Sequence, residues 1–206
     1  MSEPFLKVEK LRKQYTRGLI NKRVTFSLEA DFTIEQPAIV GMMGPNGSGK
    51  TTLFELITGS NLPSSGRVLV MGRNIHDVRY DERDRLAIHY HQSYQVRSFR
   101  RTRPAFMMQA AGSEYPMVHL FDEPQFNTQD GYIGFMLDFF RKLRSDGRLV
   151  FVCLHPNEPF HLDIMREVCE RYVFVRDGRL TLADDFESLI EMSPVREYLG
   201  RLVDAA

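Results

Sequence analysis

The feature that most constrains this chain is the nine-residue stretch GPNGSGKTT, which runs from Gly44 to Thr52. Its glycines, followed by Lys50 and Thr51, have the spacing of a phosphate-binding loop. Glycine lets the backbone curl so that successive N–H groups converge on phosphate oxygens. The lysine places a compact positive charge at the β- and γ-phosphates, and the threonine hydroxyl is a ligand for Mg²⁺. The stretch therefore predicts a site for a nucleoside triphosphate.

The segments on either side of this loop fit that role. Residues 38–43 (AIVGMM) form an apolar run typical of a buried strand, and residues 51–57 (TTLFELI) favour a helix. A helix that begins at the loop adds its free N–H groups and its dipole to the phosphate site. We therefore expect the nucleotide to be held by Gly44, Pro45, Asn46, Gly47, Ser48, Gly49, Lys50, Thr51 and Thr52.

Length and composition limit the classes of protein that the chain can belong to. Its 206 residues, 43% of them hydrophobic, suit one globular domain with a real core. The formal net charge is zero, which argues against a nucleic acid as partner. The N-terminus lacks a signal pattern, and the longest apolar runs, such as residues 149–154, are too short to cross a bilayer. With only two cysteines, we expect a cytoplasmic protein that reaches the membrane only through a partner.

Hydrophobic patterning predicts the order of strands and helices. Apolar and polar residues alternate over residues 5–34, which is typical of half-buried antiparallel strands. Further strands are expected at 66–75, 85–92, 115–124, 148–155 and 172–183, the last a hairpin that turns at Asp177 and Gly178. Helices are expected at 132–145, 162–170, 186–192 and 195–203.

This order predicts an α/β fold of the P-loop NTPase type. Strands that alternate with helices indicate a mostly parallel sheet flanked by helices, and the N-terminal strands indicate an antiparallel β lobe beside it. No repeat or linker interrupts the chain, so we expect residues 1–206 to form a single domain in which residues 185–206 are a helical tail.

Taken in order, the motifs resemble those of the ATP-binding subunit of ABC transporters over most of the chain. Besides the phosphate loop, the resemblance rests on AIHYHQ, which ends at Gln92, and on PMVHLFDEP, which contains Asp122 and Glu123. It also rests on VFVCLH, which ends at His155. The tail VREYLG, residues 195–200, is similar to one seen in lipid-export and amino-acid-uptake members. The resemblance implies ATP and Mg²⁺ as cofactors.

The resemblance also implies roles for the acidic residues. Asp122 would hold Mg²⁺ together with Thr51 and Gln92, and Glu123 would polarise the attacking water. Gln92 would also bridge the ion and that water. Phosphoryl transfer depends mostly on positioning and charge neutralisation, which such a set can supply. The alternative is a pair of acids that only caps the turn after a strand.

Two further residues receive roles from the same resemblance. His155 would contact the γ-phosphate from the end of a neighbouring strand, although an isolated histidine is more often structural. Tyr15 stands where the family stacks an aromatic ring on adenine, and the alternative is a core tyrosine.

One segment departs from the family pattern. Only 30 positions separate Gln92 from Asp122, too few for the family's helical subdomain and its Leu-Ser-Gly-Gly-Gln signature. Counting back from residue 115, the signature would fall on residues 98–103 (SFRRTR), which contain no glycine pair, and its helix on residues 103–111. The arginines there form either a solvated loop or a phosphate-facing group. Residues 125–130 also depart, with Asp130 as a remnant aspartate one position late.

The resemblance implies a subunit that binds Mg-ATP and hydrolyses it to drive transport with transmembrane partners. Such a subunit would lie on the inner face of the membrane through those partners and form an ATP-dependent homodimer or heterodimer. Because the signature is missing, we expect slow hydrolysis. The shortened segment favours an alternative, a non-transport nucleotide-binding regulator or assembly factor with little or no ATPase activity.

Overall fold

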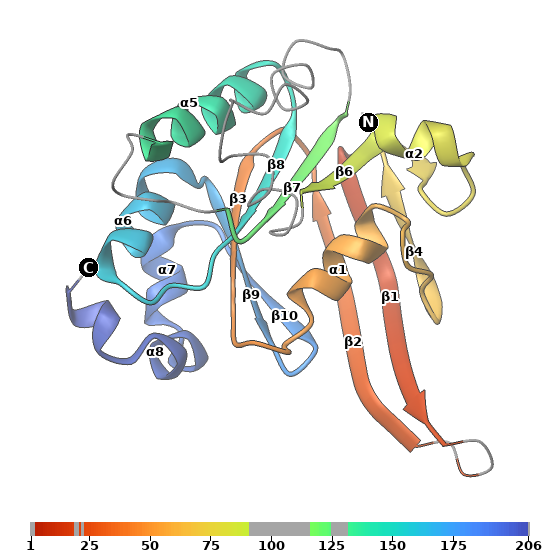
Figure 1. Cartoon of the computed structure of the whole chain (residues 1–206), viewed down its shortest axis with the longest axis horizontal. Helices are drawn as coiled ribbons and strands as arrows, with labels where there is room; N and C mark the ends of the chain where they lie inside the picture. The colour runs from red at the N-terminus through yellow and green to blue at the C-terminus, as the bar shows by residue number, and fades with distance from the viewer. Residues whose placement is uncertain (1–2, 19–20, 22, 91–115, 125–131, 206) are drawn as a thin grey trace.

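The structure, a computed structural model, describes residues 3–18, 21, 23–90, 116–124 and 132–205 of the chain. Within these residues a single sheet of 10 strands crosses the molecule, with helices packed on both of its faces (Figure 1). The strands follow the order β5-β4-β1-β2-β10-β9-β3-β8-β7-β6. This arrangement confirms the α/β fold class expected from the sequence.

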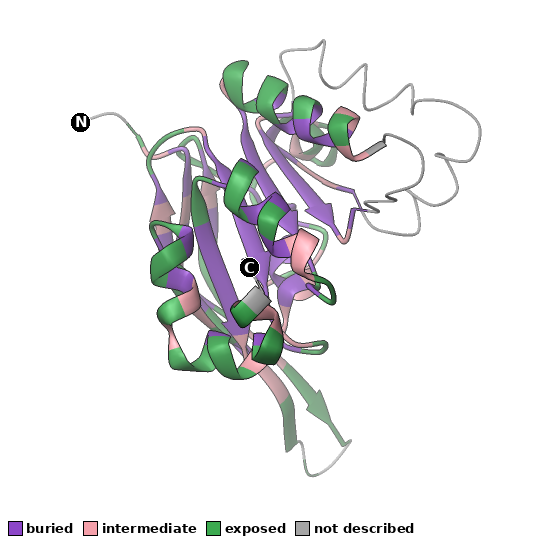
Figure 2. Cartoon of the chain, turned by 90° about the vertical axis from the view of Figure 1, so that its left-hand side faces the viewer, coloured by how far each residue is buried: buried purple, intermediate pink, exposed green. Residues whose placement is uncertain are grey.

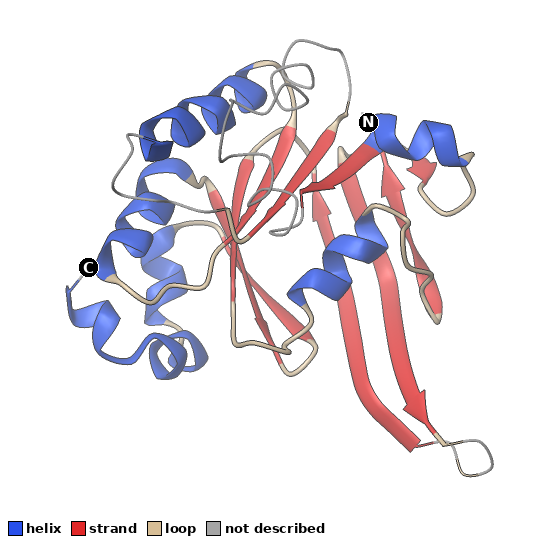
Figure 3. Ribbon diagram, in the orientation of Figure 1, coloured by secondary structure: helices blue, strands red, loops and turns tan. Residues whose placement is uncertain are grey.

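One half of the sheet is antiparallel. It consists of β1 (Leu6–Arg17), β2 (Arg23–Ile34), β4 (Ser65–Val70) and the short β5 (Arg73–Asn74). The ends of β1 and β2 extend as a two-stranded ribbon beyond the rest of the molecule (Figure 3). The alternating pattern that predicted these strands places one set of side chains in the core and the other in solvent.

The other half of the sheet is mostly parallel. The strands β3 (Ile39–Met43), β7 (Val118–Asp122) and β8 (Leu149–Cys153) are buried along their whole length, as expected for strands covered on both faces. The strands β6 (Ala87–Tyr90) and β9 (Arg171–Arg176) run parallel to them at either side.

A single residue pair joins the two halves. Strand β10 (Arg179–Ala183) is antiparallel to β9, and its first residue, Arg179, pairs in parallel with Glu29 of β2. The antiparallel lobe expected from the N-terminal strands is present, and it continues the same sheet as the parallel strands.

The helices differ from the expected ones at three places. Helix α2 (Tyr80–Leu86) was not predicted, and it occupies the first two residues of the strand expected at 85–92. Helix α6 begins at Pro159, earlier than expected, because proline suits the first helical position. The helix expected at 195–203 is divided into α8 (Ser193–Leu199) and a 3₁₀ helix (Gly200–Ala205), since Gly200 adopts φ 55°. Helix α6 spans Pro159–Val168, and the remaining helices are α1 (Lys50–Ile57), α5 (Tyr132–Ser145) and α7 (Phe186–Glu191).

Two cores lie on opposite faces of the sheet. Helix α1 and the antiparallel strands enclose one around Phe54 and Phe151, and helices α5 to α8 enclose the other around Phe121, Phe140 and Met165. In Figure 2 the parallel strands and the inner helix faces are buried, while the outer helix faces and the far ends of β1 and β2 are exposed. The carboxyl ends of β3, β7 and β8 point to the same edge, because the three strands are parallel.

Candidate nucleotide-binding site

A pocket of about 260 Å³ lies where the phosphate loop leaves β3 and α1 begins. Residues from β1, β2, the loop, α1 and the end of β7 surround it. Its lining comprises Tyr15, Phe26, Asn46, Gly47, Gly49, Lys50, Thr51, Thr52, Asp122 and Glu123. The structure thus brings together most of the residues that the sequence assigned to nucleotide binding.

The loop backbone requires glycine at its first position. Gly44 has φ 152°, and a Cβ atom there would lie 2.0 Å from the carbonyl oxygen of Val175. At Gly47 no atom lies within 4 Å of the place of a Cβ, so the middle of the loop faces open space. The loop is therefore packed against β9 on one side and open on the other.

Lys50 is curled back over this loop. Its Nζ atom donates to the carbonyl oxygens of Gly44 at 2.7 Å and Pro45 at 2.9 Å, and the residue is only 6% exposed. The hydroxyl of Ser48 is buried and has no hydrogen-bond partner in the part of the chain that the structure describes. A buried cation bonded only to carbonyls and a buried orphan hydroxyl together suit a polyanionic ligand.

Thr51 and Asp122 meet directly beneath the loop. The Thr51 Oγ1 atom donates to Oδ2 of Asp122 at 2.9 Å, although 71 residues separate them in the chain. Asp122 ends the buried strand β7, and Thr51 lies in the first turn of α1. A hydroxyl and a carboxylate are hard oxygen ligands of the kind Mg²⁺ prefers. These two residues therefore fit the ligand set that the resemblance implies.

A histidine stands behind the Asp122 carboxylate. The His89 Nε2 atom is 3.3 Å from Asp122 Oδ2, and the side chain of His89 is 13% exposed. The rings of Phe54 and His89 form a T-shaped pair, with 5.4 Å between their centroids. His89 thereby helps to hold Asp122, a contact that the sequence did not indicate.

Glu123 adopts an unusual backbone conformation at the end of β7. Its φ is 49°, in the left-handed region that residues other than glycine rarely adopt. The Glu123 N–H donates to the carbonyl of Cys153 at 3.0 Å, which ties this strained residue to the end of β8. Strained residues of this kind concentrate at functional sites, so the conformation supports the role expected for this carboxylate.

Tyr15 lies on the open side of the pocket. It is 38% exposed, so it is not a core tyrosine, which was the alternative. Its hydroxyl accepts from Asn61 Nδ2 at 2.8 Å, and Phe26, its direct partner across β1 and β2, lies 6.2 Å away between ring centroids. Phe26 therefore adds a second aromatic side to the pocket.

His155 does not line this pocket. It is exposed just after β8, and its Nδ1 atom lies 2.8 Å from the Tyr198 hydroxyl of α8. Gln92 lies outside the described residues. So do the expected signature at 98–103, its helix at 103–111 and the segment 125–130 with Asp130.

The sequence assigned no role at this site to three residues that lie near these groups. Phe26 could have been found from the register that pairs it with Tyr15 across an expected hairpin. His89 and Tyr198 carried no such signal, because parallel strand pairing and helix docking bring them close to Asp122 and His155.

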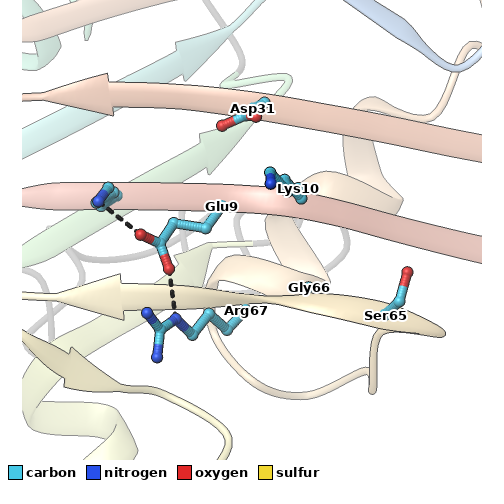
Figure 4. Close-up of a pocket in the computed structure, with 7 residues that line it drawn as sticks. Glu9, Lys10, Asp31, Ser65, Gly66 and Arg67 are labelled. Carbon is cyan, nitrogen blue, oxygen red and sulfur yellow. Dashed lines mark hydrogen bonds and ion pairs between the residues drawn. The ribbon is translucent and has the colours of Figure 1, made fainter.

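A larger surface depression, of about 750 Å³, lies elsewhere on the sheet (Figure 4). It crosses β1, β2 and β4, and Glu9 pairs there with both Lys7 and Arg67. Hydrogen bonds from Lys7 and then Arg67 lower the pKa of Glu9 to about 2. Because these charges already satisfy one another, the depression offers less to an anionic ligand than the loop does.

Comparison with known proteins finds sequence similarity to ATP-binding proteins over part of the chain. Residues 28–123 match the family model described as ABC transporter. ATP-binding protein ChvD of Rhizobium radiobacter is 42% identical over 71 residues, which are 34% of this chain and 22% of that protein. Energy-dependent translational throttle protein EttA of Escherichia coli is 41% identical over 68 residues, 33% of this chain and 11% of that one. The chain thus matches only a small part of each relative.

The fold likeness extends further along the chain than these sequence matches. The dimeric ATP-binding cassette MJ0796 in a post-hydrolysis state, bound to ADP and Pi, superposes with a TM-score of 0.66. That alignment covers 87% of this chain and 98% of the other at 17% identity. Among the described residues, none of the helices is both long enough and apolar enough to cross a membrane. Residues 28–123 thus resemble the ABC transporter family in sequence, and the fold of the chain is that of the ATP-binding cassettes.

Proposed function

We propose that this chain binds Mg-ATP and hydrolyses it to drive a membrane transporter. The contact between Thr51 and Asp122 carries the proposal, because it places two Mg²⁺-type ligands side by side in the pocket that also contains Lys50. A phosphate nest without adjacent oxygen ligands would suit any anion, whereas this arrangement suits a triphosphate with its metal ion.

Each residue of the pocket has a distinct part in this proposal. Lys50 would leave the loop carbonyls and bond to the β- and γ-phosphates, and the free N–H groups at the start of α1 would point at the same oxygens. The chemistry that bound Mg²⁺ supplies is neutralisation of phosphate charge. Tyr15 and Phe26 would hold the adenine ring of ATP between the ribbon formed by β1 and β2 and the phosphate loop.

Hydrolysis requires a base or a water-orienting group near the γ-phosphate. Glu123 lies at the pocket wall, next to Asp122, and its carboxylate would orient the attacking water. His155, Gln92 and Asp122, which would hold Mg²⁺, complete the proposed set. Residues 98–103 lack the glycine pair of the family signature, so turnover by the isolated protein should be slow.

We infer the partners and the cellular location of the chain from its likeness to the family. We propose that transmembrane subunits hold the chain at the cytoplasmic face of a membrane and that two cassettes pair around ATP. The solved cassette MJ0796, described as dimeric and bound to ADP and Pi, supports pairing as the model for this chain. Residues 1–206 would act as one domain, because both cores share a single sheet.

A second function is favoured by two observations. EttA, one of the relatives, is described as a translational throttle protein, so similarity to this family does not imply transport. The short span from Gln92 to Asp122 also leaves little chain for docking transmembrane helices. A non-transport, ATP-dependent regulator or assembly factor is therefore the alternative.

The test of nucleotide binding is Lys50→Ala, measured by calorimetry with Mg-ATP. Loss of the phosphate-facing charge should weaken binding at least tenfold, which corresponds to about 1.4 kcal/mol. Lys142→Ala is the matched control, since Lys142 is exposed on α5 and pairs with Asp146 away from the pocket. Equal affinities of wild type and Lys50→Ala would refute the assignment of the loop.

Two further measurements separate the candidate functions. Phosphate release that disappears in Glu123→Gln would support hydrolysis at this site, whereas release that persists would come from elsewhere. Co-purification of the chain with a multi-spanning membrane protein would support transport, and its isolation with cytosolic partners alone would favour the regulator.

A further inference from the structure

The C-terminal helix α8 touches the histidine that is expected to face the γ-phosphate. Tyr198 of α8 lies 2.8 Å through its hydroxyl from Nδ1 of His155, and the two rings are 6.0 Å apart between centroids. The residues are 43 positions apart in the chain, so this contact depends on how α8 docks. The family resemblance assigns no role to Tyr198.

Tyr198 is held firmly from its own side. Its ring packs on Phe174 of β9 at 5.8 Å, and its neighbours on the helix, Val195 and Leu199, are buried. The next residue toward the N-terminus, Glu197, forms a two-point ion pair with Arg176 of β9 at 2.7 and 3.0 Å. The hydroxyl therefore has a defined position relative to the end of β8.

A phenol hydroxyl can donate to Nδ1 or accept from it, so the direction of this hydrogen bond and the tautomer of His155 are set together. Burial, with smaller contributions from Cys153 and Glu123, raises the pKa of Tyr198 to about 12, so the hydroxyl keeps its proton near neutral pH. When the hydroxyl donates, it occupies the lone pair on Nδ1 of His155, and the proton of the neutral imidazole resides on Nε2. An Nε2–H group can donate to a phosphate oxygen, whereas a bare Nε2 would present a lone pair to it.

We propose that Tyr198 is a positioning residue that holds His155 in its Nε2–H tautomer and orients that N–H for the γ-phosphate. The inference rests on the role proposed for His155. It makes the C-terminal helix part of the nucleotide response, because any displacement of α8 removes the donor from Nδ1. Helix α8 thereby becomes a place from which a partner can alter the contact with ATP.

The test compares wild type with Tyr198→Phe, which keeps the ring on Phe174 and removes only the hydroxyl. Imidazole ¹⁵N chemical shifts in the ligand-free protein report the tautomer, and His155→Gln identifies the His155 signals. We expect the Nε2–H form in the wild type and a mixture of tautomers in Tyr198→Phe. Affinity for ATP should fall roughly two- to tenfold, the range for one hydrogen bond, while affinity for ADP is unchanged.

The control variant is Glu197→Gln, which alters the same helix but leaves the hydroxyl in place. It should keep the wild-type tautomer and the wild-type preference for ATP over ADP. Two tautomer results would overturn the proposal: an Nδ1–H form of His155 in the wild type, or the same tautomer in Tyr198→Phe as in the wild type. Two binding results would also overturn it: a loss of ADP affinity in Tyr198→Phe equal to its loss of ATP affinity, or an effect of Glu197→Gln equal to that of Tyr198→Phe. Absence of hydrolysis in the wild type would instead count against the proposed function, and it leaves these binding and tautomer readouts intact.

Discussion

Mild acid should destabilise this protein through one buried histidine, His119 on β7. The imidazole is fully buried, with Nε2 3.0 Å from the carbonyl of Pro116 and Nδ1 3.0 Å from the Tyr90 hydroxyl. Because a carbonyl can only accept, Nε2 carries the proton and Nδ1 accepts from Tyr90. The Tyr90 and His119 rings are stacked nearly parallel, 5.8 Å apart. A second proton on Nδ1 would break this arrangement.

The size of the effect follows from the shift in proton affinity. Burial lowers the pKa of His119 from 6.5 to about 3. The unfolded chain therefore takes up the proton near pH 6.5 and the folded chain only near pH 3. The contribution to stability is complete above pH 6.5 and is lost as the pH falls toward 3. At about 1.4 kcal/mol per pH unit, the loss between pH 6.5 and pH 5 is about 2 kcal/mol.

Urea unfolding of wild type and His119→Gln at pH 7 and pH 5 measures this loss. Glutamine retains hydrogen-bonding groups but does not titrate, so the variant should be less stable at pH 7 and less sensitive to acid. We expect the difference between the two unfolding free energies to shrink by about 2 kcal/mol from pH 7 to pH 5. His155→Gln, which removes an imidazole from the surface and not from the core, is the matched control. A difference that stays constant over this range would refute the reasoning.

Two further substitutions test how the fold holds the site. Gly178→Ala should destabilise the protein by more than about 1–2 kcal/mol in urea unfolding, because its φ is 71° and its Cβ would lie 1.8 Å from the Ser27 carbonyl oxygen. An unchanged urea midpoint would show that the junction between β10 and β2 can open freely. Tyr172→Phe should cost about 1–3 kcal/mol, since the buried hydroxyl donates to the carbonyls of Met165 and Cys169 at 3.0 Å each. A variant as stable as wild type would mean that those carbonyls find other donors.

Elements with strong local patterns were predictable from the sequence. Helix α5 was expected at residues 132–145 and occupies them, because its apolar residues recur with helical spacing. The fully buried strands β3, β7 and β8 were visible as apolar runs for the same kind of reason. Helix α2 was missed because Leu86 is its only buried residue, so its sequence YDERDRL shows no apolar stripe.

Features that depend on distant contacts were not predictable. One pair, Arg179 with Glu29, makes the sheet continuous, and a single pair leaves no pattern in the sequence. The loop and the residues Asp122 and Glu123 were predictable because their spacing is itself the motif. The contact between Tyr198 and His155 depends on the docking of a helix, which no local rule provides.

At Glu123 the left-handed backbone conformation lowers the stability of the fold, while the side chain supplies the carboxylate proposed for hydrolysis. A side chain with a Cβ at φ 49° costs on the order of 1–2 kcal/mol, which glycine would avoid. Glu123→Gly would thus relieve strain and remove the carboxylate in one step. In a lineage that needed only to bind nucleotide, selection would not oppose Glu123→Gly, because the substitution would increase stability without loss of a required function. The residue found at this position in homologues of the chain would therefore indicate whether nucleotide hydrolysis is under selection.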